Sequence, residues 1–182
     1  AAHALGRVAA YAQWRGKPQG VFLDFDDARP GEARAVCRAA LAGRGAGWLT
    51  VEETRQVLQA MGLPLVEGQA ARSAEDAAQA AAAIGFPVAV KLASHRLVHK
   101  TEVGGVMLNL RDAISVRAAY EVIESRVRQA GEFDAMEGVL VQRMLAGGVE
   151  VMVGVTEDPS FGPLIAFGLG GIHVEILGDV RF

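Results

Sequence analysis

The sequence predicts a mixed α/β fold in which helices flank largely antiparallel sheets. After a glycine-rich break at residues 43–47, segments with helical signals alternate with apolar segments of strand length. In addition, the strand-like segments 138–142 and 150–155 are joined by a connection too short for a crossover helix, so we expect them to form an antiparallel pair. These observations indicate a layered α/β structure rather than a purely parallel, doubly wound sheet.

The first region, residues 1–47, is expected to contain two helices. Apolar side chains recur there at helical spacing and predict one amphipathic helix, at Leu5, Val8, Tyr11 and Trp14. The stretch from Val21 to Arg29 is predicted to be irregular or strand-like. Pro30 marks the first turn of a second helix that is expected to end near Leu41, with Gly43 just past its end. We place the main domain boundary at the glycine-rich break.

The helices of the second region, residues 48–182, are predicted from their N-terminal capping signals. Each begins at a Ser, Thr or Asp whose side chain can accept a hydrogen bond from the first helical turn. Thr50 with Glu53 three positions later also forms a capping-box pattern. The predicted helices run from Thr50 to near Gly62, from Ser73 to Gly85, and from Asp112 or Ser115 to about Ala130.

The predicted strands of this region are short, apolar and bounded by Gly, Pro or charged residues. They cover residues 64–71, 88–92, 106–110, 138–142, 150–155 and 163–167.

Composition excludes several classes of function. A net charge of −3 offers no basic surface for nucleic acid or for an anionic membrane. Cys37 is the only cysteine, so neither a disulfide framework nor a thiolate metal cage is expected. No segment resembles a signal peptide or a membrane span. We expect a cytoplasmic enzyme or part of one, and the absence of an initial methionine suggests that other residues precede Ala1.

Lys91 and the loop that follows it are the first candidate site. A lysine within a strand usually faces solvent, but one that reaches into a cleft can contact nucleotide phosphates. The loop from Ser94 to Val106 contains several basic side chains and the pair Gly104-Gly105. Consecutive glycines allow backbone N–H groups to approach phosphate oxygens closely. This loop therefore has the composition of an anion-binding site.

His99 is the candidate nucleophile of the loop. A neutral imidazole can attack a phosphoryl group, and Glu102, three residues later, can hold the tautomer that exposes the reactive nitrogen. The alternative is an ordinary surface histidine. His95 has no such neighbour and is predicted to be a surface residue.

A second candidate region begins at the end of the strand 138–142. Backbone groups at a strand edge can bind an adenine edge, and Glu150 lies one turn further on, where a carboxylate can bind a ribose hydroxyl. Taken alone, the pattern also fits an ordinary hairpin. Residues 168–171 are rich in glycine but lack the spacing of a dinucleotide fingerprint, and His173 is predicted to be a packing or surface residue.

Taken together and in this order, these motifs resemble the ATP-grasp domain of the ADP-forming acyl-CoA synthetases, of the acetate–CoA ligase type. The matching stretches are Gly85 to Lys91, His99 to Val106, Gly138 to Met144, Glu150 to Pro163, and Phe167 to Glu175. The resemblance covers residues 48–182 and implies an ATP-grasp fold. The first 47 residues resemble the tail of a preceding succinyl-CoA-synthetase-like domain plus its linker.

The resemblance implies a reaction in which a carboxylic acid, CoA and ATP give acyl-CoA, ADP and phosphate. His99 stands at the position of the phosphohistidine and Lys91 at that of the lysine that holds the ATP phosphates. Gly104 and Gly105 match the loop over the phosphates. The adenine hinge corresponds to Val141, Gln142 and Met144, and the ribose-binding acid corresponds to Glu150.

The resemblance also implies that parts of the enzyme lie outside these residues. Members of the family continue past the position of Phe182 to an acidic segment that supplies the Mg²⁺ ligands, so no metal ligand is assigned in this chain and the fold is expected to be incomplete at its C-terminal end. A CoA-binding domain or subunit is expected as the partner. We therefore expect the 182 residues alone neither to turn over nor to bind ATP tightly.

Two alternatives stay open at the level of sequence. One is a regulatory, non-catalytic copy of the same domain in a protein lysine acetyltransferase, although a purely regulatory copy has no need of a nucleophile at His99. The other is a nucleotide- or partner-binding scaffold whose glycine loops serve only structure. The sequence predicts neither the acyl substrate nor the oligomeric state.

Overall fold

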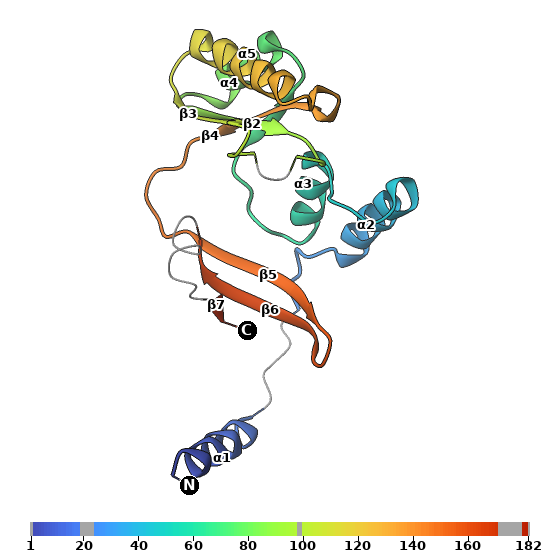
Figure 1. The fold of residues 1–182 in the computed structure, drawn as a ribbon, viewed down its shortest axis with the longest axis vertical. Coiled ribbons are helices and arrows are strands. Elements are labelled where there is room, and N and C mark those ends of the chain that lie inside the picture. The colour runs from blue at the N-terminus through green and yellow to red at the C-terminus, as the bar shows by residue number, and fades with distance from the viewer. Residues whose placement is uncertain (1, 19–23, 98–99, 171–179, 182) are drawn as a thin grey trace. The chain divides into compact units, whose positions relative to one another are not determined.

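The structure is a computed structural model and describes residues 2–18, 24–97, 100–170 and 180–181. The chain divides into two compact units, residues 1–143 and 144–182 (Figure 1). The predicted boundary after residue 47 stays a prediction. The mixed α/β fold with antiparallel sheets is confirmed.

The first two helices of the first unit are α1 and α2. The helix α1 spans Ala2–Arg15, and none of its residues is buried, so its apolar stripe is exposed. The helix α2 spans Pro30–Arg44. Its predicted end near Leu41 is wrong, because the helix continues through Gly43 and ends where Gly45 adopts a φ of 75°. A positive φ costs glycine little, which is why the chain turns there.

The three following helices begin at the predicted caps. The helix α3 spans Val51–Ala60 with the full capping box of Thr50 and Glu53, and α4 spans Ala74–Ile84 with Ser73 as its N-cap. The helix α5 spans Ala113–Gln129. Asp112 and Ser115, considered as alternative caps, act together there, because each side chain bonds the backbone N–H of the other.

Four strands form the sheet of the first unit. They are β1 (Gly68–Ala71), β2 (Val88–Ala93), β3 (Val106–Leu110) and β4 (Gly138–Arg143), in the order β1-β4-β2-β3. Every neighbouring pair is antiparallel. The first strand is shorter than predicted, since residues 64–67 lie outside the ladder. A short 3₁₀ helix, η1 (Phe133–Ala135), precedes β4.

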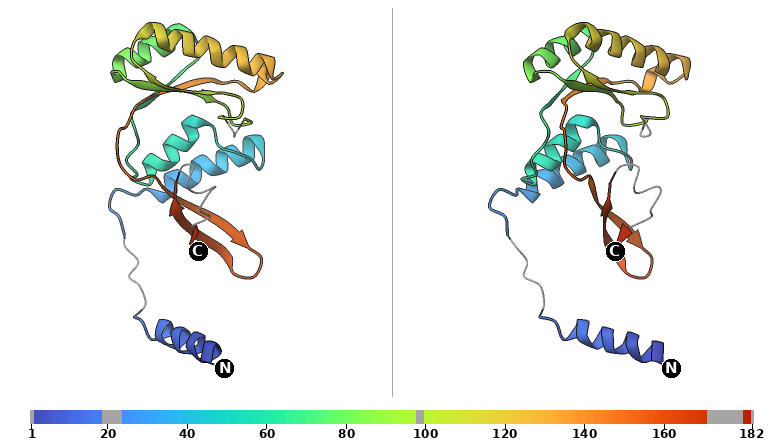
Figure 2. Two further views of the ribbon diagram at one scale, coloured as in Figure 1. Left: turned by 60° about the vertical axis from the view of Figure 1, so that its left-hand side comes forward. Right: turned by 90° about the vertical axis from the view of Figure 1, so that its left-hand side faces the viewer.

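The helices α4 and α5 cover one face of this sheet, as all the views show (Figures 1 and 2). Alternate side chains of the central strands are fully buried beneath them, including Val90, Leu92, Val139 and Val141. Because successive side chains of a strand point to opposite faces, Lys91, Leu140 and Gln142 lie on the other face. The sheet therefore has one face that belongs to the core and one face that carries Lys91 and Gln142.

The second unit contains an antiparallel sheet of three strands. They are β5 (Val151–Asp158), β6 (Gly162–Leu169) and β7 (Val180–Arg181), in that order. The predicted pairing of segments 138–142 and 150–155 is wrong. Both edges of β4 are occupied by β1 and β2, whereas β5 pairs with β6 across a tight turn in which Asp158 Oδ1 accepts the N–H groups of Ser160 and Phe161.

Within the residues that the structure describes, no helix is long and apolar enough to cross a membrane.

Candidate functional site

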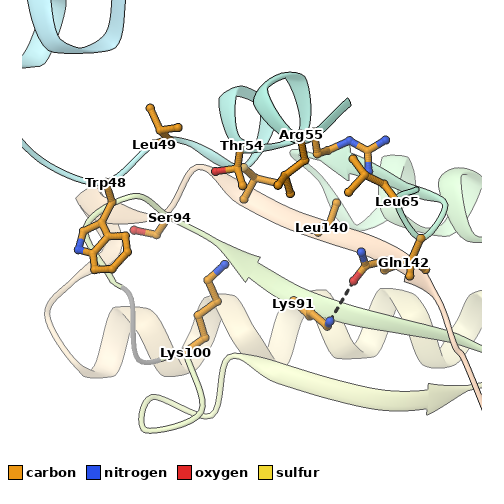
Figure 3. Close-up of a pocket in the computed structure, with 13 residues that line it drawn as sticks. Trp48, Leu49, Thr54, Arg55, Leu65, Lys91, Ser94, Lys100, Leu140 and Gln142 are labelled. Atoms are coloured by element: carbon orange, nitrogen blue, oxygen red, sulfur yellow. Dashed lines mark hydrogen bonds between the residues drawn. The ribbon is translucent and has the colours of Figure 1, made fainter. Parts of the chain in front are cut away.

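A cavity of about 440 Å³ lies between α3 and the face of the first sheet that carries Lys91 (Figure 3). Its apolar wall comes from α3, from the segments on either side of it and from β4. Trp48, Leu49, Val51, Leu58, Leu65, Val66 and Leu140 form this wall. Its polar lining consists of Thr54, Arg55, Lys91, Ser94, Lys100 and Gln142. Such a cavity, apolar with a few convergent polar groups, is the usual form of a small-molecule site.

Lys91 is held in the cavity by a cross-strand hydrogen bond. Its Nζ donates to Oε1 of Gln142 at 2.9 Å (Figure 3). The neighbouring side chains Val90 and Leu92 are fully buried on the opposite face. Lys91 therefore projects from a rigid strand, and its neutral partner leaves the positive charge available to an anion.

Lys100 brings a second ammonium group to the same cavity. It belongs to the loop that carries the candidate nucleophile and is the first residue that the structure describes after positions 98–99. Burial, followed by the charge of Lys91, lowers the pKa of Lys100 below its usual value, while Glu137 acts in the opposite direction. This shift is expected for a cation placed near another cation in a partly dry site.

Arg55 contributes a third cation, from α3. Its side chain is half-buried and lines the cavity on the wall opposite Lys91 (Figure 3). No aspartate or glutamate is among the described lining residues. Sequence reasoning missed both Arg55 and Lys100, because an isolated Lys or Arg in a sequence is usually a solvated surface residue.

The start of the loop is anchored by Ser94. This side chain is 7% exposed, and its Oγ accepts the backbone N–H groups of Arg96 and Leu97 at 3.1 and 2.9 Å. Arg96 also bonds Asp134 at 2.8 Å. His95 pairs through Nδ1 with Glu137, so it has a partner that the sequence did not reveal.

The end of the loop is a tight turn closed by the predicted glycines. The N–H of Gly105 donates to the carbonyl of Lys100 at 2.7 Å, and Gly104 adopts a φ of 62°. A Cβ on Gly105 would lie 2.9 Å from the Cβ of Leu92, so only glycine fits there. Arg126 of α5 donates to the carbonyl of Gly104 at 2.7 Å. In this structure the two glycines shape the loop and do not themselves line the cavity.

The other predicted site residues are distributed over both units. His99 lies outside the described residues, as do His173 and Glu175. Glu102 is exposed. Val141 is buried in the core, so only its backbone remains for a hinge. Of the sequence-predicted residues, Lys91 and Gln142 are brought together in the cavity.

Met144 and Glu150 belong to the second unit. Glu150 is exposed, and its carbonyl accepts the N–H of Gly170 at 2.8 Å.

The described residues do not fit a Mg²⁺ site. Among them, no group of three or more His, Cys, Asp or Glu side chains is arranged to hold a metal ion. Mg²⁺ is usually held through carboxylates together with substrate phosphates, and the cavity lining offers cations instead.

Comparison with known proteins gives consistent matches. The ATP-grasp domain family matches residues 40–182. The β subunit of acetate–CoA ligase (ADP-forming) II from Pyrococcus furiosus is 43% identical over 152 residues, which are 84% of this chain and 64% of that subunit.

Two solved structures of acetyl-coenzyme A synthetase 1 from Ca. Korarchaeum cryptofilum also match. One, in complex with coenzyme A and Ca-AMPCP, has a TM-score of 0.75 at 39% identity and covers 82% of this chain and 65% of that chain. The other contains coenzyme A and Mg-AMPPCP and has its phosphohistidine segment pointing towards the nucleotide binding site. It has a TM-score of 0.62 at 35% identity, over 81% of this chain and 62% of that chain.

The chain thus spans a little under two thirds of the length of each of these proteins. The family match covers well over half of the present residues and includes the cavity, the loop and both sheets. The chain belongs to the ATP-grasp domain family.

Proposed function

We propose that this chain is the ATP-binding, phosphohistidine-bearing part of an ADP-forming acyl-CoA ligase, which makes acyl-CoA, ADP and phosphate from a carboxylic acid, CoA and ATP. One observation carries the proposal. Lys91 and Lys100 line the same cavity, and Lys100 directly follows His99 in the sequence. A site that collects positive charge beside a potential nucleophile suits phosphoryl transfer, which depends mainly on positioning and charge stabilisation.

The cavity supplies the physical requirements for binding a nucleotide. Its apolar wall can cover a base, while the ammonium groups of Lys91 and Lys100 can neutralise phosphate oxygens. Within a partly dry cavity these charges act more strongly than they do in water. We assign the adenine hinge to the backbone of Val141 and Gln142 together with Met144, and the ribose contact to Glu150. Gly104 and Gly105 shape the turn that ends in the phosphate-binding region.

His99 is the proposed acceptor of the phosphoryl group. A ring nitrogen attacks the terminal phosphorus, an N–P bond forms, and the bond from that phosphorus to the bridging oxygen breaks. ADP leaves with the electron pair, and the attacking ring loses the proton of its other nitrogen. Glu102 is proposed to hold the reactive tautomer and to receive that proton.

The relatives support the assignment of nucleotide and partner. The solved Korarchaeum enzyme binds a nucleotide analogue and coenzyme A, and the Pyrococcus relative is one subunit of a ligase. We propose that this chain acts on ATP and works with a CoA-binding domain or subunit, in the cytoplasm. Mg²⁺ would reach the nucleotide through ligands other than the residues described here.

The test is a pair of measurements on the full-length protein and its partner. Formation of acyl-CoA from acid, CoA and ATP is measured together with ATP binding, for the wild type and Lys91→Met. The proposal requires ATP-dependent acyl-CoA formation that Lys91→Met reduces at least about tenfold. Wild-type protein that binds no ATP, or that forms acyl-CoA without ATP, would overturn it.

A further inference from the structure

Arg55 lines the cavity from α3. The start of this helix is fixed by the capping box, in which Glu53 accepts the N–H of Thr50 at 2.8 Å. Glu53 also pairs with Arg44 of α2 through two hydrogen bonds, of 3.0 and 2.5 Å. These contacts fix the start of the helix two residues before Arg55, so the backbone that carries this side chain is held in place.

Arg55 is not paired with either of the two glutamates that precede it on the helix. Glu52, three residues earlier on the helix, is a natural partner by spacing, but it accepts a hydrogen bond from Gln56 at 3.3 Å. Glu53 is occupied by Arg44 and Thr50. Among the described residues, the guanidinium of Arg55 has no hydrogen-bond or ion-pair partner. A half-buried guanidinium that keeps its donors unused is poised for an anionic ligand.

The remaining lining of the cavity defines the chemistry of that ligand. Lys91 and Lys100 line it together with Arg55, and no carboxylate among the described lining residues balances their charge. The mutual repulsion of the lysines is relieved when an anion enters. A guanidinium adds what an ammonium lacks, because its planar fork can bind two oxygens of one phosphate.

We propose that Arg55 is a phosphate-binding residue of the nucleotide site, so that α3 closes this site from the side opposite Lys91. The ligand is the phosphate chain of a nucleoside di- or triphosphate. This inference rests on the proposed function, since it places ATP in the same cavity. It adds a phosphate contact from α3, a helix that precedes the sheet. Arg55 stands 36 positions before Lys91 in the sequence.

The experiment measures ATP, ADP and adenosine binding by calorimetry in the full-length protein. Arg55→Gln removes the charge, and Arg55→Lys keeps the charge without the fork. Arg38→Gln is the matched control, because Arg38 is an exposed arginine of the neighbouring helix α2 and does not line the cavity. Thermal unfolding of each variant confirms that it is folded.

Arg55→Gln is expected to weaken ATP binding by about ten- to a hundredfold, as for the loss of a charge-assisted hydrogen bond. ADP should lose affinity as well, adenosine should be unaffected, and Arg55→Lys should fall between Arg55→Gln and the wild type. Equal losses for ATP and adenosine, or an Arg55→Gln affinity equal to that of Arg38→Gln, would overturn the inference. If Lys91→Met still weakens ATP binding in that case, the proposed function survives without Arg55.

Discussion

Lys91 of β2 and Gln142 of β4 are joined by a hydrogen bond of 2.9 Å, although 51 positions separate them in the sequence. The two strands are direct neighbours in the sheet, with Ala89 opposite Gln142 and Lys91 opposite Leu140. The bond fixes the direction of the ammonium group while leaving its charge unpaired. Gln142 is thus a positioning residue for Lys91 in addition to its proposed place at the adenine hinge.

Gln142→Glu is predicted to weaken ATP binding by about tenfold, because a carboxylate beside Lys91 forms an ion pair and competes with phosphate. Gln69→Glu makes the same charge change at an exposed position of β1 and serves as the control. Titration calorimetry with ATP checks both variants. Unchanged or tighter ATP binding by Gln142→Glu would show that the Lys91 ammonium does not meet the phosphates.

Lys100 gives the site a dependence on pH. Because burial and the charge of Lys91 lower its pKa, the ammonium loses its proton at a lower pH than an ordinary lysine would. ATP affinity is therefore predicted to fall as the pH rises through the pKa of Lys100. In Lys100→Arg, which stays charged, this fall should disappear. The test is to measure the dissociation constant for ATP across neutral and alkaline pH for the wild type and Lys100→Arg. Identical pH profiles of ATP affinity for these two proteins would contradict the prediction.

Ser94 is predicted to be the structural anchor of the loop. Ser94→Ala leaves the part-buried N–H groups of Arg96 and Leu97 without their acceptor, which should cost about 1–2 kcal/mol of unfolding free energy. The control is Ser125→Ala, since Ser125 is exposed on α5 and should change stability by less than about 0.5 kcal/mol. Chemical denaturation measures both. A Ser94→Ala protein as stable as the control would exclude the anchoring role.

The junction between α2 and α3 is predicted to weaken in acid. The hydrogen bonds from Arg44, followed by that from the backbone of Thr50, lower the pKa of Glu53 from 4.5 to about 2. A carboxylate with a lowered pKa stabilises the fold above its unfolded-state pKa and loses this contribution as the pH falls through the folded-state value. The stability difference between the wild type and Glu53→Gln should therefore shrink between about pH 4.5 and about pH 2.

Urea unfolding at several pH values measures that difference, with Glu121→Gln on the exposed face of α5 as the control. A difference that stays constant, or that grows in acid, would contradict the assignment of Glu53. The N-cap can be tested independently, because Thr50→Ala should cost about 1 kcal/mol at neutral pH.

The local features of the fold could be predicted from sequence. Capping patterns are short-range signals, so Thr50, Ser73 and Asp112 located the starts of three helices. The end of α2 was misplaced because two glycines stand close together, and only backbone conformation shows that Gly45 rather than Gly43 ends the helix. Strand pairing failed for a non-local reason, since the partners of β4 are β1 and β2, both far from it in sequence.

The candidate site was only partly predictable. Lys91 alone was weak evidence, since a strand lysine usually faces solvent, but the basic, glycine-containing loop after it and the resemblance of these motifs to a known family made it a candidate. Arg55 and Lys100 became visible only when folding brought α3 and the loop to one cavity. Sequence alone marked the basic loop around Lys100 but not the position of this side chain, and it gave no signal at all for Arg55, because their shared role depends on which residues line one cavity.

In the proposed function, this chain takes a phosphoryl group from ATP onto His99. The most direct measurement is to incubate the full-length protein with γ-labelled ATP and to quantify acid-labile label on the chain, for the wild type, His99→Ala and the control His95→Ala. We expect label in the wild type and in His95→Ala and none in His99→Ala. Label that persists in His99→Ala, or a wild-type protein that binds ATP and acquires no label, would contradict it.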